Sequence, residues 1–403
     1  VEPPLLGVLA PCREARSCPC PPLLQSPDLV PWRSVTQPQR LSGLPLLKAL
    51  ILPGLVFQSV VIAGGYGTGR ELVEFFLSQG PKGALLGIAV ATLVWSAVGA
   101  ATFEFARRAQ AFDYRAFMQA LLGRGAVFYE VAYAGMLMLV LAVVAAASGE
   151  IVRDTFGLPY ATGVALMMLL VGYLTLRGSD LIERFLTLWS ALLYVTYVVF
   201  AGWVVLKFGP EMQEAFRSEP AGTGWALSGL RYAAYNIGIL PAVLFVLRDH
   251  RDARVTLAAG ALVGPLAIAP GLLFTVALFA AYPGVLDDAV PAATVLEALG
   301  SPTFRIVFQL VLLGTLVETG TGLIHALNER VAHAVEARGR PFPDWGRSAV
   351  AVALLALGAG LSSFGLVALI ARGYGLMTWV FLLAFVIPVL TLGTWRIVRD
   401  PGA

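Results

Sequence analysis

The chain has 403 residues, of which 58% are hydrophobic and only 13% are charged, and its mean hydropathy is +0.78. Soluble domains carry about a quarter charged residues, so this composition excludes a water-soluble protein and indicates that hydrocarbon is part of the solvent. The net charge is only +3, and no basic run with interleaved aromatic residues is present, so we expect no nucleic-acid partner.

Residues 1–42 differ from the rest of the chain in composition. Proline recurs at nine positions between 3 and 38, and no helical period is present. We therefore expect a disordered tail, and the initial valine suggests a start codon assigned too far upstream. The three cysteines, Cys12, Cys18 and Cys20, all lie here. A Cys-x-Cys pair without a histidine or a second pair predicts no metal site.

Ten stretches after the tail are long and apolar enough to cross a bilayer, which takes about 20 helical residues. Eight of them are uncharged: Ala49–Gly69, Gly83–Phe103, Val131–Gly149, Thr155–Leu176, Phe185–Leu206, Val255–Leu286, Ser348–Ala371 and Gly373–Trp395. Two others, Trp225–Leu247 and Thr303–Asn328, contain charges. We predict an all-α integral membrane protein with about ten transmembrane helices in a single domain at 43–400.

The distribution of basic residues predicts how these helices are oriented. If the N-terminus is cytoplasmic, fifteen of the lysines and arginines that follow the first span lie on the inner side and eight on the outer side. Basic residues favour cytoplasmic loops, so we expect both termini inside. Arginine greatly outnumbers lysine, as in proteins from GC-rich bacterial genomes. We therefore predict a multi-pass protein of the bacterial cytoplasmic (inner) membrane.

The first span contains the sequence Ala-Gly-Gly-Tyr-Gly-Thr-Gly-Arg-Glu at residues 63–71. Each glycine weakens a helix by about 1 kcal/mol relative to alanine, and Thr68-x-x-Glu71 matches a capping box that opens a new helix. We therefore predict that one half-helix ends near Ala63 and another begins near Gly69. Unwound main chain at membrane depth survives only beside protein or water, where it can bind ions or polar solutes. A glycine-rich packing face is the alternative.

The sixth span contains a weaker counterpart at residues 235–241, Tyr-Asn-Ile-Gly-Ile-Leu-Pro. Pro241 removes a hydrogen-bond donor and clashes one turn back; a simple proline kink is the alternative to a break. Breaks in helices 1 and 6 are expected if inverted repeats at about 46–206 and 225–399 form the domain, and they indicate a transporter site. The predicted substrate-binding residues are Gly64, Gly65, Tyr66, Gly67, Thr68, Gly69, Tyr235, Asn236 and Gly238.

Two motifs resemble those of the YkvI-type uncharacterised membrane proteins. The first is Gly64-Gly65-x-Gly67-x-Gly69-x-Glu71, followed by Phe75-Phe76 and Gly80, and the second is Glu318-Thr319-Gly320-x-Gly322-Leu323-Ile324-His325, followed by Asn328-Glu329-Arg330. The resemblance covers about residues 46–400. This family is similar to the amino acid–polyamine–organocation superfamily, so the resemblance implies the LeuT fold with broken helices 1 and 6. It also implies a role as an amino acid permease, without supplying a substrate.

Charged groups inside a membrane are functional candidates because each costs at least about 2.5 kcal/mol at mid-bilayer. Glu318 is the deepest, and helical spacing places His325 on the same face. In the LeuT fold that the resemblance implies, a sodium ion can bind between helix 8 and the unwound part of helix 1. Proton coupling through Glu318 and His325 is a second option, and a structural hydrogen bond from Glu318 is a third. Glu71 is either a cap or a ligand. The predicted ion-coupling residues are Ala63, Glu71, Glu318, Thr319, Thr321 and His325.

These patterns predict a secondary transporter that works by alternating access. The expected solute is an amino acid or a related compound, coupled to Na⁺ or H⁺, with its carboxylate at the main chain near Thr68 and polar contacts from Tyr235 and Asn236. We expect no other cofactor and no enzyme activity, because no nucleotide loop or nucleophile elbow is present. A non-transporting nutrient sensor on the same fold is the alternative. The expected partners are a small-molecule substrate and the lipid bilayer, and no protein partner can be inferred.

Overall fold

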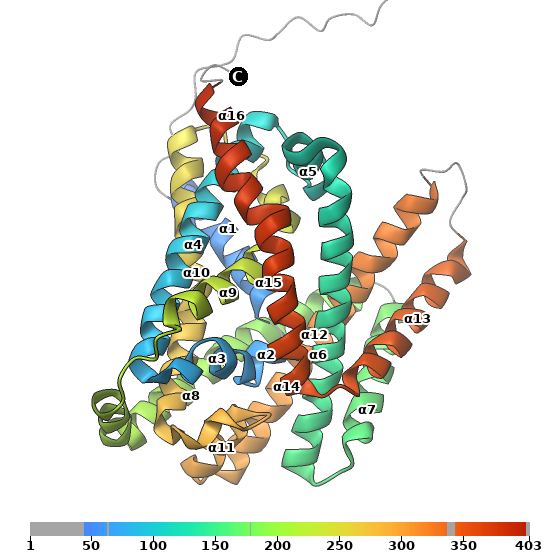
Figure 1. Ribbon diagram of the computed structural model, residues 1–403. Helices are drawn as coiled ribbons and strands as arrows, with labels where there is room; N and C mark the ends of the chain where they lie inside the picture. The colour runs from blue at the N-terminus through green and yellow to red at the C-terminus, as the bar shows by residue number, and fades with distance from the viewer. Residues whose placement is uncertain (1–43, 63, 178, 337–342, 400–403) are drawn as a thin grey trace, which may run out of the picture. The chain divides into compact units, whose positions relative to one another are not determined.

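The computed structural model describes residues 44–62, 64–177, 179–336 and 343–399, and the predicted tail at 1–42 lies outside them. Within these ranges every regular element is a helix (Figure 1). The first half contains α1 (Leu44–Val61), α2 (Gly64–Gly67), α3 (Arg70–Phe75), α4 (Gly80–Ala109), α5 (Tyr114–Leu122), α6 (Ala126–Phe156), α7 (Tyr160–Arg177) and α8 (Ser179–Ser218). The second half contains α9 (Trp225–Ile237), η3 (Leu240–Leu247), α10 (Ala253–Leu278), α11 (Pro291–Leu299), α12 (Pro302–Glu336), α13 (Asp344–Ser362), α14 (Leu366–Ala368), α15 (Gly375–Phe381) and α16 (Thr394–Arg399). Short 3-10 or π-helical segments connect them: η1 (Leu77–Gln79), η2 (Gly123–Gly125), η4 (Phe279–Ala281), η5 (Gly284–Leu286), η6 (Leu369–Tyr374), η7 (Leu382–Val386) and η8 (Val389–Gly393).

The described helices confirm an all-α protein with several membrane spans. Seven of them are long and apolar enough to cross a membrane, or eight if α9 and η3 form one bent span. α1 and α7 are shorter, with apolar parts at Leu46–Val61 and Tyr160–Thr175. The number of ten spans and the repeat boundaries therefore stay predictions.

Both predicted helix breaks are present. α1 ends at Val61 and α3 begins at Arg70, with the single turn α2 between them. The second break separates α9 from η3, and these two helices meet at an angle of 57°. The first span is therefore not a continuous glycine-rich packing helix. The second is more than a proline kink, because the helix also changes type at the bend.

The predicted capping box at the start of α3 is wrong. Gly69 occupies the position before the helix, where its φ of 82° favours glycine and it has no side chain to donate or accept. The Thr68 hydroxyl donates back to the Gly65 carbonyl at 3.0 Å and accepts only a long bond from the Arg70 amide, at 3.4 Å. Glu71 instead extends towards α9. The chain thus reverses at a glycine and does not need a side-chain cap.

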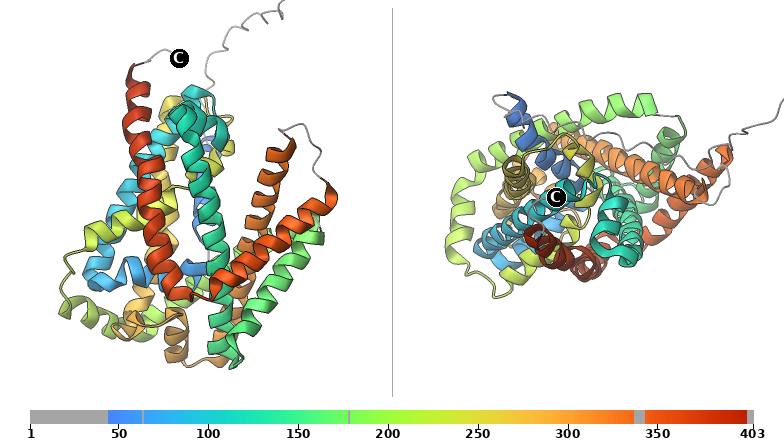
Figure 2. Two further views of the ribbon diagram at one scale, coloured as in Figure 1. Left: turned by 45° about the vertical axis from the view of Figure 1, so that its right-hand side comes forward. Right: turned by 90° about the horizontal axis from the view of Figure 1, so that it is seen from above.

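Two groups of helices make up the domain. α1, α4, α9 and α10 pack against one another, and so do α6, α7, α12 and α13; the views in Figures 1 and 2 show the two groups side by side. In the first group, main chains touch. A methyl group built on Gly99 of α4 would lie 2.5 Å from the Gly260 carbonyl oxygen of α10, and one built on Gly260 would lie 2.6 Å from the Ala100 Cα. Small residues permit this approach, which is how helices associate in lipid.

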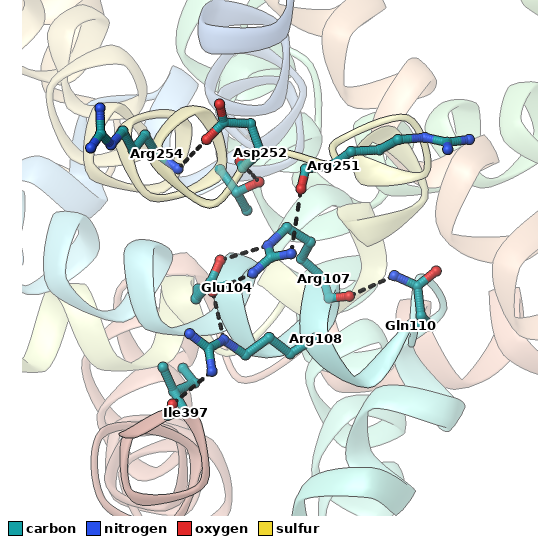
Figure 3. Close-up of polar contacts among 9 residues, drawn as sticks. Glu104, Arg107, Arg108, Gln110, Arg251, Asp252, Arg254 and Ile397 are labelled. Carbon is teal, nitrogen blue, oxygen red and sulfur yellow. Dashed lines mark hydrogen bonds and ion pairs between the residues drawn. The ribbon is translucent and has the colours of Figure 1, made fainter. Parts of the chain in front are cut away.

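A charged cluster joins three elements at the end of α4 (Figure 3). Glu104, whose side chain is only 2% exposed, accepts hydrogen bonds from Arg107 at 2.7 and 2.9 Å and from Arg108 at 2.7 Å. Arg108 also donates to the Ile397 carbonyl of α16 at 2.8 Å, and Arg107 donates to the Arg251 carbonyl at 3.4 Å. The buried carboxylate therefore fixes two arginines that tie α4 to α16 and to the segment before α10.

The α4–α10 contact predicts opposite effects for two glycine substitutions. Gly260→Ala should lower the free energy of unfolding by about 1–3 kcal/mol, because the new methyl group meets main chain that cannot give way. Gly202→Ala in α8, where nothing lies within 4 Å, should be neutral or slightly stabilising. Thermal unfolding in detergent, followed by loss of the monodisperse peak in gel filtration, measures both. Equal melting temperatures for the two variants would contradict the contact.

Candidate substrate cavity

A cavity of about 380 Å³ lies beside the two helix breaks. Residues Val61, Ile62 and Glu71 line it from the two sides of the first break, and Tyr235 and Asn236 line it from the end of α9. Glu318 and Thr319 line it from α12, which belongs to the second group of helices. The cavity thus lies between the two groups and brings together five predicted site residues: Glu71, Tyr235, Asn236, Glu318 and Thr319.

Glu71 connects the elements around both breaks. Its carboxylate is buried, and one oxygen, Oε1, accepts a hydrogen bond from the Tyr235 hydroxyl and a longer one, at 3.5 Å, from Asn236 Nδ2. A methyl group built on Gly65 would lie 2.7 Å from the other oxygen, Oε2. Gly65 is therefore a glycine because the carboxylate lies against it. Glu71 joins α2, α3 and α9 and does not cap α3.

Tyrosine rings form much of the remaining polar wall. Tyr235 stacks on Tyr374 with 4.8 Å between ring centroids, and Tyr133 and Tyr194 also line the cavity. Tyr194 donates to Gln58 Oε1 at 2.8 Å. Sequence patterns do not predict Tyr133, Tyr194 and Tyr374, because these residues come from α6, α8 and η6, and no local motif distinguishes them from other aromatic residues in the membrane.

Two of the predicted ion-coupling residues on α12 lie outside the cavity. Thr319 lines it, whereas Thr321 is buried elsewhere and donates to the Val317 carbonyl at 2.7 Å. Two residues correspond to about 200° of helix rotation, so both threonines cannot face one chamber. His325 is exposed and lies about 10 Å along the axis from Glu318. A Glu318–His325 relay within the cavity is therefore wrong.

Residues 65–69 of the first break also lie behind the cavity wall, which corrects their predicted role. Gly65, Tyr66, Gly67, Thr68 and Gly69 are buried, and none of them lines the cavity. A methyl group on Gly67 would collide with the Leu312 side chain, and the Tyr66 hydroxyl lies over Gly271. Gly64 begins α2, Ala63 lies outside the described residues, and the predicted roles of these two residues stay predictions. These glycines permit close packing around the break.

Gly238 has a comparable packing role at the second break. A methyl group there would collide with the Phe381 ring, and the Gly238 carbonyl accepts a hydrogen bond from the Tyr129 hydroxyl at 2.9 Å. The prediction that Gly238 binds substrate is therefore corrected: of the second motif, Tyr235 and Asn236 line the cavity and Gly238 does not.

The cavity adjoins a vestibule of about 630 Å³ on the side of α5. The two hollows share Tyr133, Ala242 and Ala326. Arg330 lies at the vestibule wall between two aromatic rings, 4.2 Å from the Tyr114 centroid and 3.9 Å from that of Tyr133. The cavity is therefore accessible from the end of the domain that carries α5.

The other end of the cavity is covered. Arg70 of α3 donates to the carbonyls of Leu286 at 2.6 Å and Asp288 at 3.1 Å, and it pairs with Glu74 at 2.9 Å. The Ala292 amide of α11 donates to the Thr68 carbonyl at 3.1 Å. The segment that contains η5 and α11 is thus fixed to the residues just after the first break, and the Thr68 carbonyl is occupied by that contact.

A second hollow, of about 570 Å³, lies between α1, α8 and α10, and it is a weaker candidate. It shares Val56, Ser59 and Tyr194 with the cavity, but none of the described residues that line it is charged. Of these two hollows, as lined by the described residues, the chamber with Glu71 and Glu318 is the one that offers carboxylates to a solute.

Comparison with known proteins decides the fold. No family model matches the chain. The uncharacterized membrane protein YkvI of Bacillus subtilis (strain 168) is 25% identical over an alignment of 286 residues that covers 68% of this chain and 79% of YkvI, so the predicted resemblance is confirmed. The crystal structure of MhsT in complex with L-phenylalanine superposes with a TM-score of 0.56 at 15% identity, over 87% of this chain and 97% of MhsT. The chain has the LeuT fold. In this fold α1–α3 and α9–η3 are the broken helices 1 and 6. Mhp1, a nucleobase-cation-symport-1 family transporter with bromovinylhydantoin bound, superposes with a TM-score of 0.48 at 13% identity, over 87% of this chain and 93% of Mhp1.

The open vestibule of this LeuT-fold protein predicts a pattern of thiol labelling. In a chain whose three native cysteines are replaced by serine, Ala326→Cys should react with a membrane-impermeant maleimide added on the α5 side. Ser228→Cys, which lies under the covered end where Ser228 donates to the Phe75 carbonyl at 2.5 Å, should not react. Exposed Ser78→Cys is the matched control for the opposite face. Labelling of Ala326→Cys only from the Ser78 side would contradict the direction of the opening.

Proposed function

We propose that the protein is a secondary transporter that moves a small solute, an amino acid or a related amine, across a membrane by alternating access. The observation that carries this proposal is a cavity beside both helix breaks, open through a vestibule at one end and covered at the other. Such a chamber exposes a central site to one side at a time. The shared fold with MhsT, which was solved in complex with L-phenylalanine, supports an amino acid as the first solute to test.

We place the vestibule on the cytoplasmic side of a bacterial inner membrane, with both termini inside. Arg115 and Arg330 line the vestibule, and Arg107, Arg108 and Arg251 cluster at the end of α4, just before α5. Basic residues concentrate on cytoplasmic segments, which supports this orientation.

Coupling to a cation is the second part of the proposal. Glu318 and Thr319 lie on one wall of the cavity and offer a carboxylate and a hydroxyl oxygen, both of which suit Na⁺. Glu318 could equally carry a proton through the cycle. Because His325 lies outside the cavity, a proton route would depend on Glu318 and its neighbours alone.

Counterflow in proteoliposomes tests the transport function. Vesicles loaded with one unlabelled amino acid at a time should accumulate the same labelled solute, because an alternating-access carrier exchanges internal for external substrate. A solute that raises the melting temperature of the purified protein but shows no counterflow would favour the alternative function of a nutrient sensor. Empty vesicles and vesicles containing heat-denatured protein are the controls.

The different positions of Thr319 and Thr321 allow sodium coupling to be distinguished from proton coupling. If Na⁺ is the coupling ion, Thr319→Ala should raise the Na⁺ concentration for half-maximal uptake by about tenfold, since a lost contact to a charged group costs about 1.5–3 kcal/mol. Thr321→Ala, on the other face of α12, should leave it unchanged. If H⁺ is the coupling ion, uptake should be independent of Na⁺, and Glu318→Gln should abolish its dependence on a proton gradient. Equal effects of the two threonine substitutions would argue against a sodium site at Thr319.

A further inference from the structure

The cavity presents a buried carboxylate for which the surrounding residues provide no counter-charge. Both hydrogen-bond donors to Glu71, the Tyr235 hydroxyl and the Asn236 amide, are uncharged. Among the described residues that line the cavity there is no lysine, arginine or histidine. An ionised carboxylate at this depth is stable only when a cation accompanies it.

Two arginines that lie on the helices joined by Glu71, Arg70 on α3 and Arg231 on α9, have other contacts. Arg70, its neighbour in the chain, points to the covered end, where it binds two main-chain carbonyls and Glu74. Arg231, one turn before Tyr235, lies over the Phe75 ring at 5.7 Å from its centroid and does not line the cavity. Neither forms an ion pair with Glu71 in the described part of the chain. The available sources of positive charge are therefore a proton and the solute itself, and a cationic solute can take the place of the proton.

The described residues of the same wall provide no cationic side chain for a negatively charged group. Of the first break, which the sequence suggested as a carboxylate site, the described residues 65–69 do not line the cavity, and the Thr68 carbonyl already accepts a bond from the Ala292 amide. Four tyrosines, Tyr133, Tyr194, Tyr235 and Tyr374, line the chamber, and aromatic side chains of this kind are frequent partners of ammonium groups. A zwitterion would find an anionic partner for its amine but, among the described residues that line the cavity, no cationic partner for its carboxylate.

We propose that the cavity selects amines of net positive charge, such as an amino acid with a cationic side chain, and that Glu71 determines this specificity by pairing with the solute's ammonium group. The inference rests on the proposed transport function and narrows its substrate class. It does not depend on the state of Glu318, because a coupling cation at that residue leaves the charge of Glu71 to be balanced.

Three compounds of similar shape separate the contribution of the additional ammonium group from that of the carboxylate. L-lysine carries the additional ammonium group, L-norleucine lacks it, and pentane-1,5-diamine keeps both ammonium groups but lacks the carboxylate. In binding to purified protein and in counterflow, we expect lysine to exceed norleucine by at least about tenfold and the diamine to compete at least as well as lysine. L-glutamate should not compete.

Glu71→Gln keeps the size of the side chain and an acceptor for Tyr235 while removing the charge. This variant should lose the preference for lysine over norleucine, with at least about a tenfold weaker affinity for lysine. Glu71→Asp should retain the preference. Glu74→Gln, on the same helix but paired with Arg70 outside the cavity, is the matched control and should also retain it.

The outcomes distinguish this inference from the proposed function. Counterflow of norleucine equal to that of lysine, or a preference for lysine that survives Glu71→Gln, would overturn the charge selection and leave a transporter of neutral amino acids. A diamine that fails to compete would overturn the claim that the cavity lacks a carboxylate site. If none of the solutes binds or exchanges, the transport function fails and this inference fails with it. If Glu71→Gln does not fold, the wild-type ratio of lysine to norleucine still decides the question.

Discussion

Main-chain groups that leave a helix inside a membrane need partners, because hydrocarbon supplies none. At the first break, the Gly69 amide donates to the Tyr66 carbonyl at 3.0 Å, and the Thr68 carbonyl accepts from α11. At the second break, the Gly238 carbonyl accepts from Tyr129, and the Ile239 amide donates to the Asn236 carbonyl at 3.3 Å. Two of these four bonds are local, and the two to the Thr68 and Gly238 carbonyls come from elements distant in the sequence. The neighbouring helices therefore help to stabilise both breaks, and the cavity forms where those helices leave space.

The fold was largely predictable from the sequence because its signals are local. Four glycines within residues 64–69 weaken a helix wherever it lies, and Pro241 disrupts the preceding turn by its own geometry. The length and apolar character of the spans follow from the bilayer thickness. The capping box failed for a reason that is also local: Gly69 takes a left-handed conformation, so the chain enters α3 without the threonine at the cap position.

The candidate site was only partly predictable, because lining a cavity depends on what lies opposite. A glycine can expose its main chain to a cavity, or it can make room for a neighbouring side chain. The sequence does not distinguish these two roles. Gly67 admits Leu312, which lies far along the chain, and Gly238 admits Phe381. Thr319 and Thr321 are equally polar, and only the rotation of α12 in the assembled domain decides which of them faces the cavity. Tyr374 stacks on Tyr235 from a π-helical segment near the C-terminus, and no local sequence motif predicts this contact.

The main-chain contact between α4 and α10 has a mechanical consequence. Where side chains separate two helices, the helices can tilt by exchanging rotamers, but backbones in direct contact have no such freedom. At Gly99 and Gly260 the angle between α4 and α10 can change only if the helices come apart. A movement that uncovers the opposite end of the cavity must therefore move α4 and α10 together as one rigid body. The backbone then bends outside these two helices, at segments where the chain is not a regular helix.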